Sequence, residues 1–247
     1  MLKVSSVLIL SDNEQILIRF RQLITSGNLM EQYHFEYAFS AFNCSLTQKF
    51  EGEDWISPLT IKNSIEKLVS KYSIIFSLHS KQIFPPELVN QVRCYNVHPG
   101  YNPYNRGWYP QVFSIINGLP AGATIHEIDE ELDHGRIICQ KKVEIFTWDT
   151  SLSVYNRILD AEMELLSKWL EPILKGEYEP VKAEEGNINL KSDFNELLEL
   201  DLQRQDSLEN HINLLRALTH GDYDNAYFID NQGNKVFVRI QLTPEGK

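Results

Sequence analysis

The chain has 247 residues, of which 43% are hydrophobic and 23% charged, and its formal net charge at pH 7 is −11. This composition is ordinary for a soluble globular protein, and a chain of this length buries enough surface to fold without disulfides or structural metals. The negative charge argues against nonspecific binding to nucleic acid or to anionic membranes, which attract positively charged proteins. We expect one large domain, or one of ~170 residues with a smaller appendage.

Cysteine usage and hydropathy favour a cytoplasmic protein. The three cysteines, Cys44, Cys94 and Cys139, form neither a C-x-x-C pair nor an even framework of disulfides, which is typical of a reducing compartment. The apolar run near the N-terminus is too short for a signal peptide, and no run approaches the ~18 apolar residues of a membrane span. The seven histidines and three cysteines lack metal-ligand spacing, so we expect no metal site.

The chain opens with a predicted strand, helix and strand. The apolar run 4–10 and the segment 33–39 are typical of buried strands. Asp12 is a suitable N-cap for the helix between them, whose apolar residues share one face: Ile16, Leu17, Phe20, Leu23 and Ile24. A β-α-β opening usually begins a parallel sheet. The first turn lacks G-x-G-x-x-G, so a dinucleotide site of that kind is not supported.

Strands and helices continue to alternate up to residue 175. Apolar runs predict strands at 73–78, 94–97, 123–128 and 137–145, and apolar periodicity predicts helices at 61–72, 86–91, 109–117 and 150–175. Residues 41–60 are mixed and irregular. This alternation predicts an α/β fold with a Rossmann-like, mostly parallel sheet and flanking helices, in a first domain at residues 1–176.

Residues 177–247 form a predicted C-terminal extension. Its first part, up to residue 192, is charged and weakly patterned like a linker, and a helix is predicted near 208–218. Two apolar runs then flank a turn at Asn231–Gly233, which predicts a β-hairpin. Because a lone hairpin is marginally stable in water, we expect it to pair with a second copy in a homodimer.

Three polar residues at predicted strand ends are candidates for catalysis. Asn96 and His98 are two residues apart at the end of a strand, so their side chains share a face. His98 can accept a proton at neutral pH, and Asn96 can donate a hydrogen bond to an oxyanion. Asp133, in a later turn, could orient His98. Ligands bind beyond the carboxyl ends of parallel strands, so these residues predict an acyl-transfer site.

The order of motifs along the chain resembles that of the folate-dependent formyltransferases. The matching segments are Asn96-Val97-His98, Pro103, Arg106-Gly107, Asn117-Gly118, Gly122-Ala123-Thr124 and Leu132-Asp133-His134-Gly135. That family usually has Ser-Leu-Leu-Pro after the histidine, whereas this chain has Gly100-Tyr101-Asn102-Pro103. The departure resembles the sugar-nucleotide N-formyltransferases, as do the segments 215–218 and 225–228.

The resemblance implies a reaction and a site. A formyl group would move from 10-formyltetrahydrofolate to the amine of a dTDP-linked amino sugar used in surface polysaccharide synthesis, without a metal. His98 would be the general base, Asn96 the oxyanion donor, and Asp133 the residue that orients His98. The resemblance implies further that the folate lies against Gln82, Ile83 and Phe84 on one side and the turn that begins at Asp129 on the other.

Candidates for binding the sugar nucleotide follow the Asn-x-His motif. They are Asn102, Asn105, Arg106 and Trp108. Arg106 could bind a phosphate or stabilise its loop, and Trp108 could pack on a ring or only within the protein. Other histidines have no motif partner: we expect His126 and His134 at the surface or at strand ends, and favour a structural role for His79.

Other functions stay open. One is formyl transfer to glycinamide ribonucleotide or to methionyl-tRNA, although tRNA binding fits poorly with the net charge. A second is hydrolysis of the formyl donor, because the same three side chains can activate water. A third is a non-catalytic folate-binding or nucleotide-binding protein.

Overall fold

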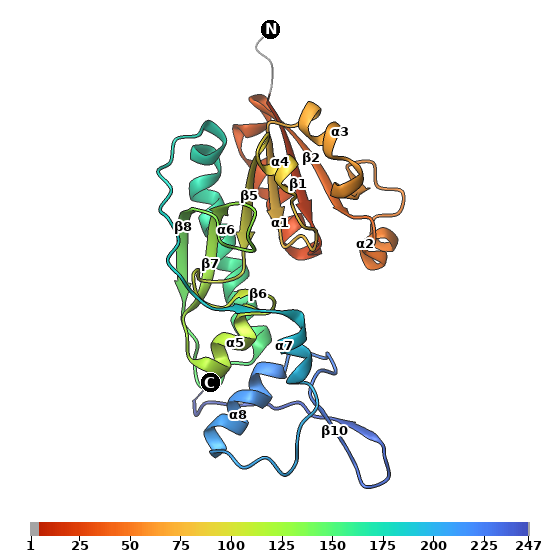
Figure 1. Cartoon of the computed structure of the whole chain (residues 1–247), viewed down its shortest axis with the longest axis vertical. Coiled ribbons are helices and arrows are strands. Elements are labelled where there is room, and N and C mark those ends of the chain that lie inside the picture. The colour runs from red at the N-terminus through yellow and green to blue at the C-terminus, as the bar shows by residue number, and fades with distance from the viewer. Residues whose placement is uncertain (1–4, 247) are drawn as a thin grey trace. The chain divides into compact units, whose positions relative to one another are not determined.

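Seven strands form the main sheet, in the order β3-β2-β1-β4-β5-β7-β8 (Figure 1). The computed structural model describes residues 5–246. The strands are β1 (Ser5–Ser11), β2 (Tyr33–Ser40), β3 (Ile56–Leu59), β4 (Ile74–Leu78), β5 (Arg93–His98), β7 (Ala121–Glu127) and β8 (Ile137–Val143). Strands β1 to β5 pair in parallel and β7 is antiparallel to β5. The predicted α/β fold with a mostly parallel sheet is confirmed.

The longer helices follow the predicted alternation, whereas the short helices at 44–49 and 191–196 and the strand at 56–59 were not predicted. The helices are α1 (Glu14–Ser26), α2 (Cys44–Lys49), α3 (Ile65–Lys71), α4 (Pro86–Val89), α5 (Pro110–Asn117), α6 (Ser151–Lys175), α7 (Lys191–Glu196) and α8 (Leu208–Leu218), with 3-10 turns η1 (Asn28–Glu31) and η2 (Ile61–Asn63). The predicted helix at 61–72 is wrong in its first turn, because Ser64 separates η2 from α3. Within the described residues, no helix combines the length and apolar character of a membrane span.

Two predictions at the chain's start need correction or comment. The predicted strand at 4–10 includes Val4, which lies outside the described residues, and β1 follows from Ser5 to Ser11. The N-cap of α1 is Asn13, whose side chain accepts from the Ile16 amide, and not Asp12. Asp12 instead accepts hydrogen bonds from Ser40, Asn43 and Lys81. The Asp12 carboxylate therefore bonds to residues distant in the chain and does not cap α1.

The chain forms two compact units. The first contains the described residues up to His98, Thr124–Gln140 and Glu162–Ala183, and the second contains Pro99–Ala123, Lys141–Ala161 and the described residues from Glu184 onward. In the first unit, helices and strands enclose a core cluster of Leu8, Leu10, Ala38, Ile61, Leu68, Tyr72, Ile75, Phe84, Leu88, Val92 and Cys94. The predicted domains at 1–176 and 177–247 are parts of the chain that would fold separately. The compact units do not test this, so the two domains stay a prediction.

The second unit contains the predicted hairpin and a smaller parallel pair. Strands β10 (Tyr227–Ile229) and β11 (Lys235–Phe237) form the antiparallel hairpin. The pair β6 (Arg106–Gly107) and β9 (Ile188–Asn189) was not predicted, because two-residue strands carry no periodicity. Helices α5 and α8 pack together. Arg216 of α8 donates to the carbonyl oxygens of Phe146 and Asp149, which ties this helix to the residues before α6.

The core cluster of the first unit makes a stability prediction. Leu88 is fully buried in this cluster, so Leu88→Ala should leave a cavity and lower the free energy of unfolding by about 2–5 kcal/mol. Urea denaturation followed by circular dichroism measures this change. Met30→Ala, at a side chain that is 59% exposed, should stay within about 0.5 kcal/mol of the parent. Equal losses in the two variants would contradict the assignment of Leu88 to the core.

Candidate active site

Strand β5 places Asn96 and His98 on one face of the sheet. Residues two apart on a strand project to the same side, while Tyr95 and Val97 between and beside them are buried on the opposite side. In the register with β4, Asn96 lies beside Ser77, and in the register with β7 it lies beside His126. Both side chains therefore sit at the carboxyl end of β5, where parallel strands leave room for a ligand.

Asp133 lies against both of these residues. The amide nitrogen Nδ2 of Asn96 donates to Asp133 Oδ1 at 2.8 Å, and His98 Nδ1 lies 3.5 Å from Asp133 Oδ2. His98 and Asp133 are both buried. A carboxylate at Nδ1 favours the tautomer with the proton on Nδ1 and stabilises the imidazolium, so that Nε2 can accept a proton. The structure thus brings together the three residues that the sequence singles out.

The backbone of the turn holds Asp133 in place. Its φ is 49°, in the left-handed region that aspartate tolerates better than most residues. Gly135 follows two residues later, and a Cβ there would lie 1.8 Å from the Glu127 carbonyl oxygen. Nearby, Asp129 accepts from the Glu131 amide at 3.0 Å and lies 3.1 Å from His134 Nδ1. Position 135, where the turn passes β7, therefore has room only for glycine.

His126 is a site residue that sequence reasoning missed. Of the two positions expected for it, the strand end is confirmed, since it lies near the end of β7, and the surface is wrong, since its side chain is buried. Its Nδ1 lies 2.7 Å from the Glu127 carbonyl oxygen and must donate to it, while Nε2 is 3.3 Å from Asn96 Nδ2 and 3.6 Å from Asp133 Oδ1. The contact depends on the antiparallel pairing of β7 with β5. The sequence pattern predicted mostly parallel pairing and so gave no sign of it.

The loop after β4 carries the three residues predicted to contact folate. Gln82 uses its side chain internally, donating to the Leu59 carbonyl and accepting from the Ile61 amide at 2.8 Å. Phe84 is buried in the core cluster, whereas Ile83 is 86% exposed. Only Ile83 thus presents its side chain, together with the backbone of this loop. Contact of these residues and of Asp129 with folate stays a prediction.

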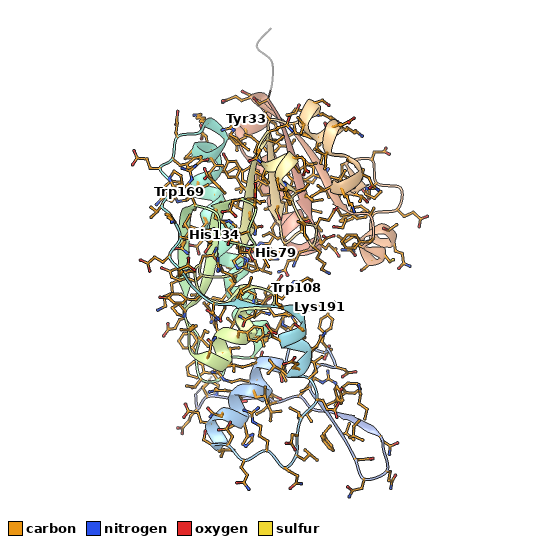
Figure 2. The ribbon with its side chains drawn as sticks, viewed as in Figure 1. Tyr33, His79, Trp108, His134, Trp169 and Lys191 are labelled. Carbon is orange, nitrogen blue, oxygen red and sulfur yellow. The ribbon has the colours of Figure 1, made fainter. Side chains whose placement is uncertain are left out.

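The four residues predicted to bind the sugar nucleotide belong to the second unit. Asn105 is fully buried, and its side chain joins a network that contains Ser114, Asn117, Asn187 and Asn189. This arrangement gives Asn105 a role in holding the loop. Asn102 and Arg106 are also buried, and no hydrogen-bond partner for Arg106 Nε lies among residues 5–246. Trp108 is partly exposed, with Lys191 Nζ 5.6 Å from its ring centroid (Figure 2).

Glycines shape the same loop. Gly107 has φ 88°, and a Cβ there would lie 2.4 Å from the Asn189 carbonyl oxygen. A Cβ at Gly186 would lie 1.9 Å from the Pro103 carbonyl oxygen. The loop after His98 is thus closely packed on the segment that leads into α7. Among the described residues, no group of three or more His, Cys, Asp or Glu side chains is arranged to hold a metal ion.

Known proteins are similar to this chain in sequence. Residues 46–170 match the family model described as "Formyl transferase", and residues 193–244 match "N-formyltransferase dimerization C-terminal domain". A "dTDP-4-amino-4,6-dideoxyglucose formyltransferase" of Mycobacterium tuberculosis is 51% identical over 186 residues, which cover 75% of this chain and 80% of that protein. A methionyl-tRNA formyltransferase of Bacillus cereus is 32% identical over 139 residues, covering 54% and 44%.

Solved structures are similar over nearly the whole chain. A 4-N formyltransferase from Francisella tularensis has a TM-score of 0.92 and 43% identity, covering 98% of this chain and 99% of that one. A sugar N-formyltransferase from a Shewanella species has a TM-score of 0.91 and 43% identity with the same coverage.

The Gly135 contact gives a prediction for the Asp133 turn. Gly135→Ala should force the turn away from β7 and destabilise the protein by about 1–3 kcal/mol, as overpacking does. A thermal melt should show a drop of about 2–4 °C per kcal/mol. Gly27→Ala is the matched control, since its Cβ would meet no atom closer than 3.7 Å. An unchanged melting temperature for Gly135→Ala would show that the turn has room for a side chain.

Proposed function

We propose that this chain, which belongs to the formyl transferase family and is a sugar N-formyltransferase, transfers the formyl group of 10-formyltetrahydrofolate to the amine at C4 of a dTDP-linked amino-dideoxy sugar. The Mycobacterium tuberculosis relative is named for such a sugar, and the Francisella tularensis protein is called a 4-N formyltransferase. The observation that carries the proposal is the Asp133 carboxylate against Asn96 and His98, because formyl transfer needs a base beside an oxyanion donor.

The proposed reaction begins when the neutral sugar amine attacks the formyl carbon. A carbon–nitrogen bond forms, and the carbonyl oxygen becomes the oxyanion of a tetrahedral intermediate. His98 Nε2 accepts the amine proton, and Asp133 at Nδ1 stabilises the imidazolium. The bond from carbon to N10 of the folate then breaks, and N10 takes the proton from His98. General base catalysis of this kind contributes about 10²–10⁴ in rate.

Asn96 has two amide hydrogens for two tasks. One donates to Asp133 at 2.8 Å, and the other points toward His126 Nε2 at 3.3 Å. The second hydrogen bond is long, so an oxyanion near this hydrogen can replace His126 Nε2 as its acceptor while the first bond keeps Asn96 in place. Loss of such a donor costs about 10²–10³ in rate. His126, bonded to the Glu127 carbonyl oxygen through Nδ1, limits the movement of the amide.

Arg106 and Trp108 are the proposed contacts to the sugar nucleotide. A phosphate would supply the Arg106 guanidinium with the acceptor that Nε lacks among the described residues. Trp108 offers a partly exposed ring, with the Lys191 ammonium near it to favour an anionic ligand. Asn102 stays a proposed contact. For Asn105 the buried asparagine network supports a loop-stabilising role over ligand contact.

The proposal extends to assembly and cellular role. Residues 193–244 match a dimerization domain, and the hairpin exposes the apolar side chains of Ile229, Val236 and Phe237. Both observations support a homodimer that buries this face. A role in surface polysaccharide synthesis follows from the resemblance to dTDP-sugar enzymes. The three free thiols are compatible with work in the cytoplasm.

A second candidate is formyl transfer to methionyl-tRNA, which the Bacillus relative suggests. A net charge of −11 opposes tRNA binding, so the sugar nucleotide is favoured. Hydrolysis of the formyl donor uses the same three side chains and differs only in the acceptor. A non-catalytic binding protein would not need the Asn96–Asp133–His98 arrangement.

A turnover assay tests the proposed function. The protein and 10-formyltetrahydrofolate are mixed with a panel of dTDP- and UDP-linked amino sugars, and release of tetrahydrofolate and formylation of the sugar are both measured. We expect a dTDP-linked 4-amino sugar to be formylated. Folate release without an acceptor would establish the hydrolase instead.

The same assay tests the proposed catalytic residues. His98→Asn should lower kcat by about 10²–10⁴, because no base remains, and Asn96→Ala should lower it by about 10²–10³. His34→Asn, at a side chain that is 62% exposed, is the matched histidine control and should keep the parental rate. Parental kcat in His98→Asn would remove His98 from the mechanism.

Sedimentation tests the proposed dimer. The parent should sediment with the mass of a dimer, and Phe237→Asp should sediment as a monomer, since a charge in an apolar interface is costly. Phe42→Asp, at an exposed aromatic residue in the first unit, should leave the dimer intact. A monomer mass for the parent at every concentration would exclude the dimer.

A further inference from the structure

A second buried pair of titratable residues lies in the first unit and has no part in the proposed reaction. Glu162 of α6 is fully buried, and His79 Nε2 lies 2.7 and 3.0 Å from its two carboxylate oxygens. A buried carboxylate is unfavourable unless it is paired. Burial raises the pKa of Glu162, and His79 opposes that rise, with a smaller contribution from Arg19 of α1. The contact needs one proton between the two groups, whichever of them holds it.

His79 is the residue at which the chain leaves β4. Its φ is 59°, in the left-handed region that histidine, like asparagine and aspartate, adopts more often than other residues with a side chain. The register that pairs Leu78 with Val97 makes His79 the neighbour of His98 at the same end of the sheet. The bond to Glu162 holds the side chain of His79 at the point where the loop of residues 80–84 begins.

The residues after His79 are held at further points. The Lys81 amide donates to Asp12 Oδ2 at 2.8 Å, and the Gln82 amide donates to Ser80 Oγ at 3.2 Å. The Gln82 side chain bonds to the backbone at Leu59 and Ile61. These contacts occupy the side chains that hold the loop in place. The parts of the loop that remain for a ligand are its backbone and the exposed side chain of Ile83. His79–Glu162 is the anchor nearest to the strand end.

We propose that His79 and Glu162 are a positioning pair, which sets the path of residues 80–84 and so the affinity for the formyl donor. The inference rests on the proposed function and on the predicted contact of folate with Gln82, Ile83 and Phe84. Neither side chain touches the reacting atoms in this proposal. A displaced binding loop weakens productive binding of the donor, while the site for the sugar nucleotide, on other residues, is unaffected.

His79→Asn tests the positioning role. Asparagine tolerates the left-handed backbone but is too short to reach Glu162. We expect KM for 10-formyltetrahydrofolate to rise on the order of 10- to 100-fold, as misplacement of a binding group does, with KM for the sugar nucleotide within about twofold of the parent. Glu164→Gln, at an exposed position of the same helix, is the matched control and should leave both KM values unchanged.

A folded His79→Asn with a parental KM for the donor overturns the proposal, as does an equal rise in both KM values. If His79→Asn does not fold, Glu162→Asp decides, because it keeps the charge and withdraws it from His79: a raised donor KM supports the pair and a parental one overturns it. If neither variant folds, the pair supports the whole fold and the proposal is overturned.

Calorimetry with tetrahydrofolate separates this inference from the proposed function. A parent that binds no tetrahydrofolate overturns the proposed function. A parent that binds it and a His79→Asn variant that binds equally well overturn only the positioning role. Weaker binding by His79→Asn beside unchanged binding by Glu164→Gln supports the pair.

Discussion

The site depends on the placement of one carboxylate in a buried environment. Asp133 is buried with Asn96, His98 and His126 around it. A buried charge is tolerated only where it is paired or hydrogen-bonded. Asn96 donates to this carboxylate and His98 Nδ1 faces it, so these three side chains hold one another in position. The left-handed backbone at Asp133 and the absence of a side chain at Gly135 permit this arrangement. Orientation of the imidazole and of the amide follows from it.

At three places along the carboxyl edge of the sheet, a carboxylate binds residues at or just after a strand end. Asp12 collects donors from the end of β2 and from the loop after β4, Glu162 binds the residue that ends β4, and Asp133 binds the last residues of β5. Parallel strands bring their carboxyl ends to one edge, where backbone groups leave the ladder and need partners. Asp12 supplies such partners to the amides of Ser40 and Lys81, whereas Glu162 and Asp133 hold side chains at this edge.

Residues 102–109 are held in place by hydrogen bonds between neutral amide side chains and not by carboxylates. Asn105 bonds to Asn117 and Asn187, and two glycines allow the backbone of the loop to approach the segment 184–190. A fully satisfied network of amides is rigid without adding charge, so the cation of Arg106 keeps its preference for an anion. This property agrees with the proposed contact between Arg106 and a phosphate.

The sequence by itself determined the α/β fold, the order of nearly all strands and helices, and the family, because apolar periodicity and the spacing of Asn96, His98 and Asp133 are local signals. The two-residue strands β6 and β9, the short elements α2, β3 and α7, and the helix break at Ser64 escaped these signals. Only the tertiary structure decided that His126 faces Asn96 and that Glu162 meets His79. It also decided that Asp12 bonds to distant loops and that Asn105 turns inward. These contacts depend on strand register and on the rotation of α6, which join residues far apart in the chain and leave no pattern within a window of sequence.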